Sequence, residues 1–91
     1  MAHGPRLDQE TLFTWRIALG QAIRHARESR KLTQADVASE LEWARATVAA
    51  IERGRQAVSC DQLLQLAFLF GLDVTELLPV VLFRPGSRRV A

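Results

Sequence analysis

The stretch that decides the fold is LEWARATVAAIERGR, residues 41–55. Val48 and Ile51 stand three residues apart, and Gly54 follows where a left-handed glycine commonly ends a helix. The spacing therefore predicts a short helix over Arg45–Arg53 that buries one side. The opposite side is nearly bare, because four residues in this stretch have only a methyl group as side chain: Ala44, Ala46, Ala49 and Ala50.

Capping signals place the starts of three further helices. Residues 33–36 (TQAD) and 59–62 (SCDQ) are capping boxes, in which two side chains pair with N–H groups that the first helical turn leaves unpaired. Residues 73–76 (DVTE) are a weaker form of the same signal. Gly71 stands at the end of the preceding helix, and Pro79 stops the last one.

Apolar residues recur at helical spacing between these marks, so the predicted fold class is all-α. Five helices with short connections are expected, at about Asp8–Arg30, Gln34–Leu41, Arg45–Arg53, from the Ser59 capping box to Phe70, and Val74–Leu78. The first helix is unusually long. A short C-terminal tail follows the last helix, and in it Val80–Phe83 is a candidate short strand.

Composition indicates one ordinary globular domain. The 91 residues carry a net charge of +2, which permits a polyanionic partner without requiring one. The longest apolar run, Leu77–Phe83, is far shorter than the ~18 residues that a membrane-spanning helix needs. Arg6, Asp8 and Glu10 precede any apolar stretch, so the start does not resemble a secretory signal. A cytoplasmic protein with no membrane segment is expected.

Groups for catalysis or metal binding are not apparent in the sequence. Cys60 is the single cysteine, so it forms no intramolecular disulfide and cannot make a zinc site by itself. A redox sensor at this helix start is an alternative to an unremarkable small residue, and the weaker one. His3 and His25 lack partner ligands at metal spacing, and no nucleophile–base pair is visible. We therefore expect no enzyme activity, no cofactor and no metal.

Three segments together resemble the Cro/lambda-repressor-like DNA-binding domain of the XRE family of regulators. They are LTQADVASEL (32–41), ATVAAIERGR (46–55) and LLQLAFLFGLDVTELL (63–78), and the resemblance covers roughly Ile17–Leu78. It implies a helix-turn-helix DNA-binding domain over 17–78. An N-terminal extension of the first helix (1–16) precedes this domain, and a tail with a candidate dimer contact (79–91) follows it.

The resemblance implies that the helix over 45–53 is a recognition helix for the major groove of double-stranded DNA. Its candidate base-contacting residues are Arg45, Ala46, Thr47, Ala49 and Ala50. Three residues match positions that contact the DNA backbone: Gln34, Arg53 and Arg55. Arg45 can donate two hydrogen bonds to guanine, and Ala46 and Ala50 can meet thymine methyl groups. We expect a sparse direct readout supplemented by DNA shape; the alternative is that the alanines reflect helix propensity alone.

Two residues depart from the family pattern. Glu42 replaces the usual glycine of the turn, so the turn either avoids the left-handed conformation or strains a non-glycine residue. Ala44 replaces the usual Ser or Thr cap, at a cost of about 1 kcal/mol, and leaves N–H groups that could bind a DNA phosphate. Trp43 is expected to be buried rather than stacked on a base. Glu52 is expected to be a structural partner of a nearby arginine, modest in worth if exposed.

The fourth helix is apolar nearly all round, which favours contact with another chain. The expected homodimer interface comprises Phe68, Val80, Val81, Leu82 and Phe83, with Phe13 and Ile17 as a second face. A dimer suits an inverted-repeat operator, and the expected function is a sequence-specific transcriptional regulator, a repressor. The alternative is a protein-interaction module such as an antitoxin, which binds a partner protein and could also bind DNA. The tail arginines either add phosphate contacts or belong to an inert solvated segment.

Overall fold

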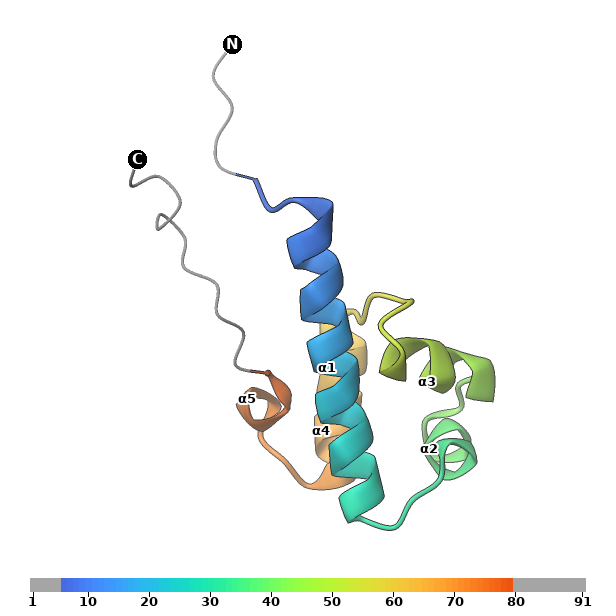
Figure 1. The fold of residues 1–91 in the computed structure, drawn as a ribbon. Helices are drawn as coiled ribbons and strands as arrows, with labels where there is room; N and C mark the ends of the chain where they lie inside the picture. The colour runs from blue at the N-terminus through green and yellow to red at the C-terminus, as the bar shows by residue number, and fades with distance from the viewer. Residues whose placement is uncertain (1–5, 80–91) are drawn as a thin grey trace.

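A computed structural model describes residues 6–79, and this part of the chain consists of five helices joined by short connections (Figure 1). The helices are α1 (Gln9–Ser29), α2 (Gln34–Leu41), α3 (Arg45–Glu52), α4 (Cys60–Phe70) and α5 (Val74–Leu77). The predicted all-α fold is confirmed, and each predicted helix is found in its place. The candidate strand Val80–Phe83 lies outside the described residues.

The long helix α1 runs through the middle of the molecule, and α3, α4 and α5 pack against it (Figure 1). α2 packs on α3, α3 packs on α1, and α5 contacts both α4 and α1. The first turns of α1 extend beyond the other helices (Figure 1). None of the helices within residues 6–79 combines the length and apolar character needed to span a bilayer.

The predicted capping boxes explain where α2, α4 and α5 begin. The Thr33 hydroxyl accepts from the Asp36 N–H at 3.0 Å, and the Asp36 carboxylate accepts from the Thr33 N–H at 2.8 Å. These hydrogen bonds lower the pKa of Asp36, because they favour its charged form. Ser59 begins α4 and Asp73 begins α5 with the same reciprocal arrangement. Local sequence therefore fixes the start of each of these helices.

The core is formed by the apolar faces of all five helices. Its buried residues are Leu19, Ile23, Ala26, Val37, Ala38, Val48, Ile51, Leu66, Ala67, Phe70 and Leu77. Leu12 and Trp15 continue the apolar stripe of α1 towards its N-terminus, where they line a cavity of about 220 Å³ beside residues 56–58. The domain core thus uses the C-terminal two thirds of α1, and the residues of the N-terminal part are exposed or half-buried.

Gly20 allows α1 and α3 to touch backbone to backbone. A Cβ atom at this position would lie 2.5 Å from the carbonyl oxygen of Ile51 and 2.6 Å from that of Glu52. Both distances are shorter than any real Cβ contact, so a larger residue would push the helices apart. Gly54, which follows α3, has a φ of +75° as predicted and packs against Ile17. The position of α3 is therefore set by close contact with α1.

Candidate nucleic-acid interface

The outward face of α3 presents the residues that the sequence predicted for base contact. Arg45 and Ala46 at its N-terminal end are exposed, whereas Thr47, Ala49 and Ala50 are half-buried. Val48 and Ile51 on the opposite face are each 2% exposed and belong to the core. The predicted division of this helix into an inner and an outer face is confirmed.

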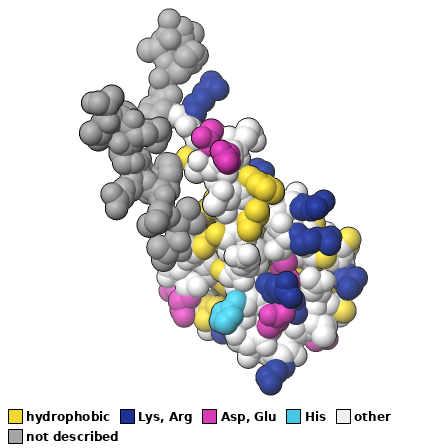
Figure 2. Space-filling view, viewed as in Figure 1, with side chains coloured by type: hydrophobic (Ala, Val, Ile, Leu, Met, Phe, Trp, Pro, Cys, Tyr) yellow, Lys and Arg dark blue, Asp and Glu magenta, His cyan; other side chains and the backbone are white. Residues whose placement is uncertain are grey.

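Arg53 and Arg55 follow α3 and are both exposed. Arg53 was expected within the helix, but it is the C-cap residue, and its N–H donates to Ala49 at 3.1 Å. The N–H of Arg55 donates to the carbonyl of Ala50 at 2.9 Å, which closes the end of the helix. Lys and Arg side chains gather on the α3 side of the molecule (Figure 2). Two cations thus stand at one end of α3 and Arg45 stands at the other.

The turn between α2 and α3 contains a strained residue. Glu42 has φ 59° and ψ 42°, the left-handed conformation that glycine adopts without cost. Of the two alternatives predicted for this turn, the strained non-glycine residue is the one observed, at a cost of about 1 kcal/mol. Trp43 donates its N–H to Ala38 at 2.9 Å, and its half-buried side chain packs against the core. Trp43 is therefore a packing residue, although its burial is only partial where full burial was expected.

The N-terminus of α3 differs from those of the other helices. Ala44 is its N-cap residue, and no side chain caps the helix there. The four other helices of residues 6–79 each begin with a side-chain cap from Asp8, Thr33, Ser59 or Asp73. The predicted loss of the cap at Ala44 is confirmed, and the positive end of the α3 dipole stands at the surface beside Arg45.

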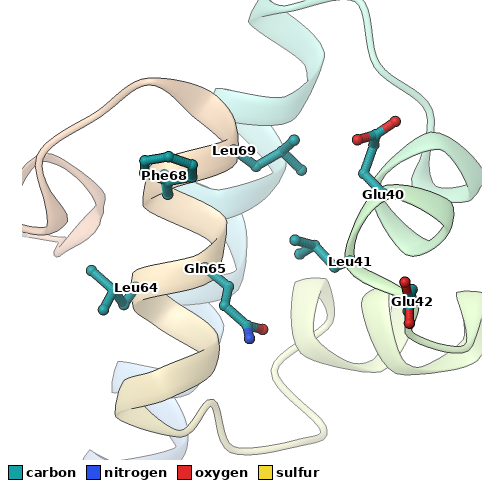
Figure 3. A pocket seen from close by; sticks show the side chains of 7 residues that line it. All are labelled: Glu40, Leu41, Glu42, Leu64, Gln65, Phe68 and Leu69. Atoms are coloured by element: carbon teal, nitrogen blue, oxygen red, sulfur yellow. The ribbon is translucent and has the colours of Figure 1, made fainter.

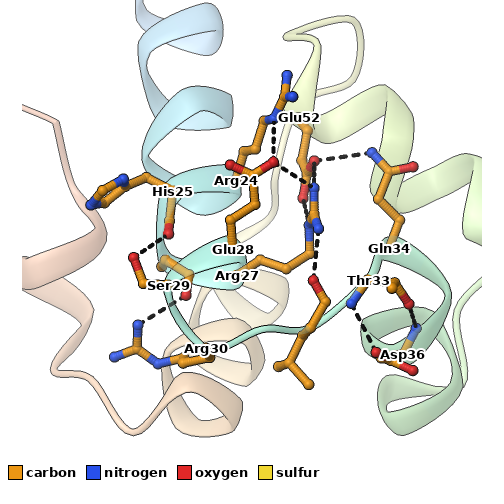
Figure 4. Close-up of polar contacts among 12 residues, drawn as sticks. Arg24, His25, Arg27, Glu28, Ser29, Arg30, Thr33, Gln34, Asp36 and Glu52 are labelled. Atoms are coloured by element: carbon orange, nitrogen blue, oxygen red, sulfur yellow. Dashed lines mark hydrogen bonds and ion pairs between the residues drawn. The ribbon is translucent and has the colours of Figure 1, made fainter.

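A buried ion pair fixes the other end of α3 to α1. Arg27 donates from Nε to Glu52 Oε2 at 2.6 Å and from Nη2 to Oε1 at 2.9 Å (Figure 4). Its Nη1 donates to the carbonyl of Leu32 at 2.8 Å. The hydrogen bonds to Glu52 raise the pKa of Arg27 against the opposing effect of burial. The guanidinium of this α1 residue thus binds both α3 and the α1–α2 connection.

Glu52 is a structural partner of an arginine, as predicted, but it is not exposed. Its side chain is 3% exposed and that of Arg27 is 9% exposed. Substituting one residue of such a pair leaves a buried charge without its partner. The resulting loss of stability is far larger than that from losing a surface ion pair. The contribution of Glu52 is therefore larger than the modest one expected for an exposed pair.

Gln34 joins the same network from the start of α2. Its Nε2 donates to Glu52 Oε1 at 3.0 Å (Figure 4). A carboxamide nitrogen has two N–H groups, so one donor is used within the protein and a second remains. The predicted backbone-contacting residue is thus held at the junction of α2 and α3, half-buried, with its amide orientation set by Glu52.

Arg27 and Gly20 are the positioning residues that the sequence analysis missed. Arg27 could have been found, because it follows Ile23 and Ala26 on the buried face of α1, where an unpaired arginine is costly. The remaining predicted site residues lie elsewhere. Phe68 is on α4, and Val80–Phe83 are outside the described residues. Within residues 6–79, no group of three or more His, Cys, Asp or Glu residues could hold a metal ion.

α2 and α3 are two short helices joined by a tight turn. The outer face of α3 is exposed on a basic side of the molecule, and its inner face packs on α1. This arrangement defines a helix-turn-helix DNA-binding fold. The comparison with protein families supports this class, since the model of a helix-turn-helix domain matches residues 18–79. The chain therefore belongs to this helix-turn-helix family, and its resemblance to the XRE family of regulators is confirmed.

Solved structures of bacterial regulators resemble the chain closely. The restriction-modification controller protein C.AhdI from Aeromonas hydrophila is 31% identical, with a TM-score of 0.65 over 67% of this chain and 92% of that one. The DNA-binding domain of BldD from S. venezulae is 32% identical, with a TM-score of 0.67 over 72% and 99%. The clp gene regulator ClgR from C. glutamicum is 30% identical, with a TM-score of 0.67 over 70% and 83%. A comparison with curated proteins gave no match.

Proposed function

We propose that the protein is a homodimeric, sequence-specific transcriptional regulator that binds double-stranded DNA and acts as a repressor. The observation that carries the proposal is the exposed end of α3, where Arg45 and Ala46 project from a helix that Gly20 and the Arg27–Glu52 pair hold in place. The proposed DNA-binding domain comprises residues 17–78, with 1–16 as an extension of α1 and 79–91 as a dimer-contact tail.

Base readout is sparse in this proposal. Arg45 donates two hydrogen bonds to the O6 and N7 atoms of a guanine in the major groove. Ala46 and Ala50 contact thymine methyl groups, and Thr47 and Ala49 complete the face that approaches the bases. Because small side chains occupy most of this face, α3 can lie deep in the groove. Sequence-dependent DNA shape supplies the remaining specificity.

Backbone contacts position α3 on the duplex. Arg53 and Arg55, both exposed, bind phosphates at the C-terminal end of α3. Gln34 binds a phosphate through its second N–H group, while Glu52 orients the amide. The uncapped N–H groups beyond Ala44 lie at the positive end of a helix dipole, which also suits a phosphate. Such contacts carry affinity but no base specificity.

The homodimer is proposed to form through Phe68, Val80, Val81, Leu82 and Phe83. Phe68 supports this interface because it is 88% exposed, an unusual state for a large apolar side chain on a helix. A two-fold symmetric dimer matches an inverted-repeat operator. Phe13, which is 51% exposed on α1, offers a second apolar contact.

An in vitro selection from a random duplex library at near-physiological salt tests the proposed function. We expect enrichment of an inverted repeat, with half-sites about one helical turn apart. We also expect one guanine in each enriched half-site to be the base that Arg45 contacts. When the selection is repeated with Arg45→Ala, enrichment of this guanine should disappear. A pool without enrichment, obtained with folded protein, would contradict specific DNA binding.

A protein-interaction module is the second candidate, favoured by the exposed apolar side chains Leu64 and Phe68 on α4. The salt dependence of binding separates the two functions. For DNA binding, a plot of log K against the logarithm of the salt concentration has a slope of about −0.9 per phosphate contact. The affinity of an apolar protein contact depends only weakly on salt. A flat salt dependence with a captured partner would favour this second function.

A further inference from the structure

A groove of about 800 Å³ separates the C-terminal end of α2 from α4 (Figure 3). Its lining residues are Glu40, Leu41 and Glu42 from α2 and the turn, and Leu64, Gln65, Phe68 and Leu69 from α4. Leu41 points across the groove towards α4, and Leu69 points back towards α2 (Figure 3). The floor is apolar, and the α2 side carries two carboxylates.

This groove is unusual because its apolar side chains remain accessible to water. Phe68 is 88% exposed and Leu64 is 59% exposed, while Leu41 and Leu69 are half-buried. Glu40 and Glu42 are both exposed, and neither forms an ion pair with another residue of the described part of the chain. The groove therefore has the chemistry to bind a segment that combines apolar side chains with basic ones.

Residues 80–91, VVLFRPGSRRVA, have this composition. Four consecutive apolar residues come first, followed by Arg84, Arg88 and Arg89, and the segment contains no acid. It begins directly after Pro79, and α5, which precedes it, packs against α4. The division of the segment into an apolar and a basic part matches a groove whose apolar face lies on α4 and whose carboxylates lie on α2.

We propose that residues 80–91 of each protomer dock in the α2–α4 groove of the other protomer. Val80–Phe83 cover Leu64 and Phe68, and the arginines pair with Glu40 and Glu42. The inference rests on the proposed homodimer and specifies what joins it. Twelve residues reach at most about 40 Å when extended, several times the ~10 Å diameter of a helix, so the segment can span the groove.

The proposed homodimer favours exchange of the tails between protomers over docking of each tail in its own groove. A stable dimer commonly buries about 800 Å² on each partner. A tail that docked on its own protomer would bury no surface between the two chains. Reciprocal docking places two segments and two grooves in one symmetric interface, so each contact occurs twice. The exposed Phe68 of each protomer then has an apolar partner.

Two charge-reversed variants test the exchange. Glu40→Lys/Glu42→Lys reverses the groove, and Arg84→Glu/Arg88→Glu/Arg89→Glu reverses the tail. Each variant alone places like charges at both contacts of its homodimer, so we expect its dimer dissociation constant to rise roughly tenfold to a hundredfold. Lysine near the C-terminal end of α2 is compatible with the helix dipole, and circular dichroism checks that both variants fold. Sedimentation without DNA measures the dimer.

An equimolar mixture of the two variants gives the decisive result. In the mixed dimer the reversed tail meets the reversed groove, and the unchanged tail meets the unchanged groove, so both contacts are attractive. We expect the mixture to form a heterodimer with an affinity within a few fold of the wild-type dimer. Failure of the mixture to dimerise, together with rescue when all five substitutions share one chain, would assign docking to the protomer's own tail and overturn the exchange.

The remaining outcomes separate this inference from the proposed function. Unchanged dimerisation of both variants would overturn the tail–groove contact and leave the homodimer in place. A wild-type protein that stays monomeric, even on its selected DNA, would overturn the homodimer itself. The same sedimentation series therefore distinguishes the two failures.

Discussion

Helices α3 and α4 each have an outward face that the core does not use, and the two faces have opposite chemistry. α3 presents small residues with Arg45 at one end. Its backbone packs against Gly20 of α1, and the carboxylate of Glu52 binds Arg27 of α1. α4 presents Leu64 and Phe68, which no other part of residues 6–79 covers. The difference agrees with the proposed division of the molecule, in which α3 presents small residues and arginines to DNA and α4 presents large apolar side chains to another chain. The following variants test this division.

The largest effect is expected where α3 is anchored. Glu52→Ala should lower the free energy of unfolding by about 3–5 kcal/mol, because it leaves the Arg27 guanidinium buried without its partner. Urea denaturation measures the loss. The control is Arg24→Ala, since the pair of Arg24 with Glu28 has side chains that are 62% and 51% exposed. That variant should lose no more than about 0.5 kcal/mol. Equal losses would remove the anchoring role of Glu52.

Gly20→Ala tests the backbone contact between α1 and α3. The added Cβ would lie 2.5 Å from a backbone carbonyl oxygen that cannot rotate away. We therefore expect the free energy of unfolding to fall by about 2–3 kcal/mol, near the upper end of the usual cost of overpacking. This cost exceeds the ~1 kcal/mol gain in helix propensity. DNA affinity should fall as well, because α3 shifts. Gly71→Ala is the control, since its Cβ meets nothing within 4 Å. It should strain a left-handed residue without changing DNA affinity.

Arg45→Ala tests the polar face of α3. Affinity for the selected operator should fall by about 1–3 kcal/mol, while affinity for an unrelated duplex changes less. Fluorescence anisotropy at one salt concentration compares the two duplexes. Arg53→Ala is the matched control, because loss of a phosphate contact should weaken both duplexes alike. If Arg45→Ala also weakened both equally, Arg45 would be a phosphate contact and the sparse readout would be wrong.

Glu42→Gly tests the strain in the turn. Glycine adopts the left-handed conformation without the Cβ clash, so we expect a gain of up to about 1 kcal/mol in the free energy of unfolding. Glu40→Gly, two residues earlier and within α2, should instead lose about 1 kcal/mol through lower helix propensity. Thermal unfolding of the two variants gives the signs. A loss for Glu42→Gly would mean that the glutamate makes a compensating contribution.

The smallest effect on stability is expected on the outward face of α4. Phe68→Ala should change the free energy of unfolding of the monomer by no more than about 0.5 kcal/mol, because the side chain is 88% exposed. Its dimer should nevertheless dissociate more readily. Phe70→Ala, on the same helix but 4% exposed, should lose about 3–5 kcal/mol. Comparable destabilisation by both substitutions would show that Phe68 belongs to the core.

Features that depend on neighbours in the sequence were predictable. The boxes that start α2 and α4 involve residues three apart, so Thr33 and Ser59 indicated the helix boundaries before any packing was known. The division of α3 into a core face and an outer face followed from helical periodicity alone. The same periodicity identified Phe68 as an apolar residue beyond the core stripe of α4.

Features that depend on how helices cross were not predictable in this way. Arg27 and Glu52 are separated by 25 positions, and their pairing requires α1 and α3 to lie together. Gly20 has no local signal, because its role comes from the closeness of another backbone. At Glu42 the sequence left two alternatives open, and only the observed φ decides between them.

In the proposed mode of DNA binding, the alanines of α3 determine how readily the target sequence can change in evolution. Ala46, Ala49 and Ala50 are not members of the core cluster, and α3 is held by contacts on its other side. A polar residue introduced at the exposed Ala46 can add a base contact without a compensating change in the interior, whereas the half-buried Ala49 and Ala50 leave less room for a larger side chain. In the proposed mode of DNA binding, a lineage that carries this fold can therefore acquire a new operator by a single substitution at Ala46, with selection acting on DNA recognition more than on folding.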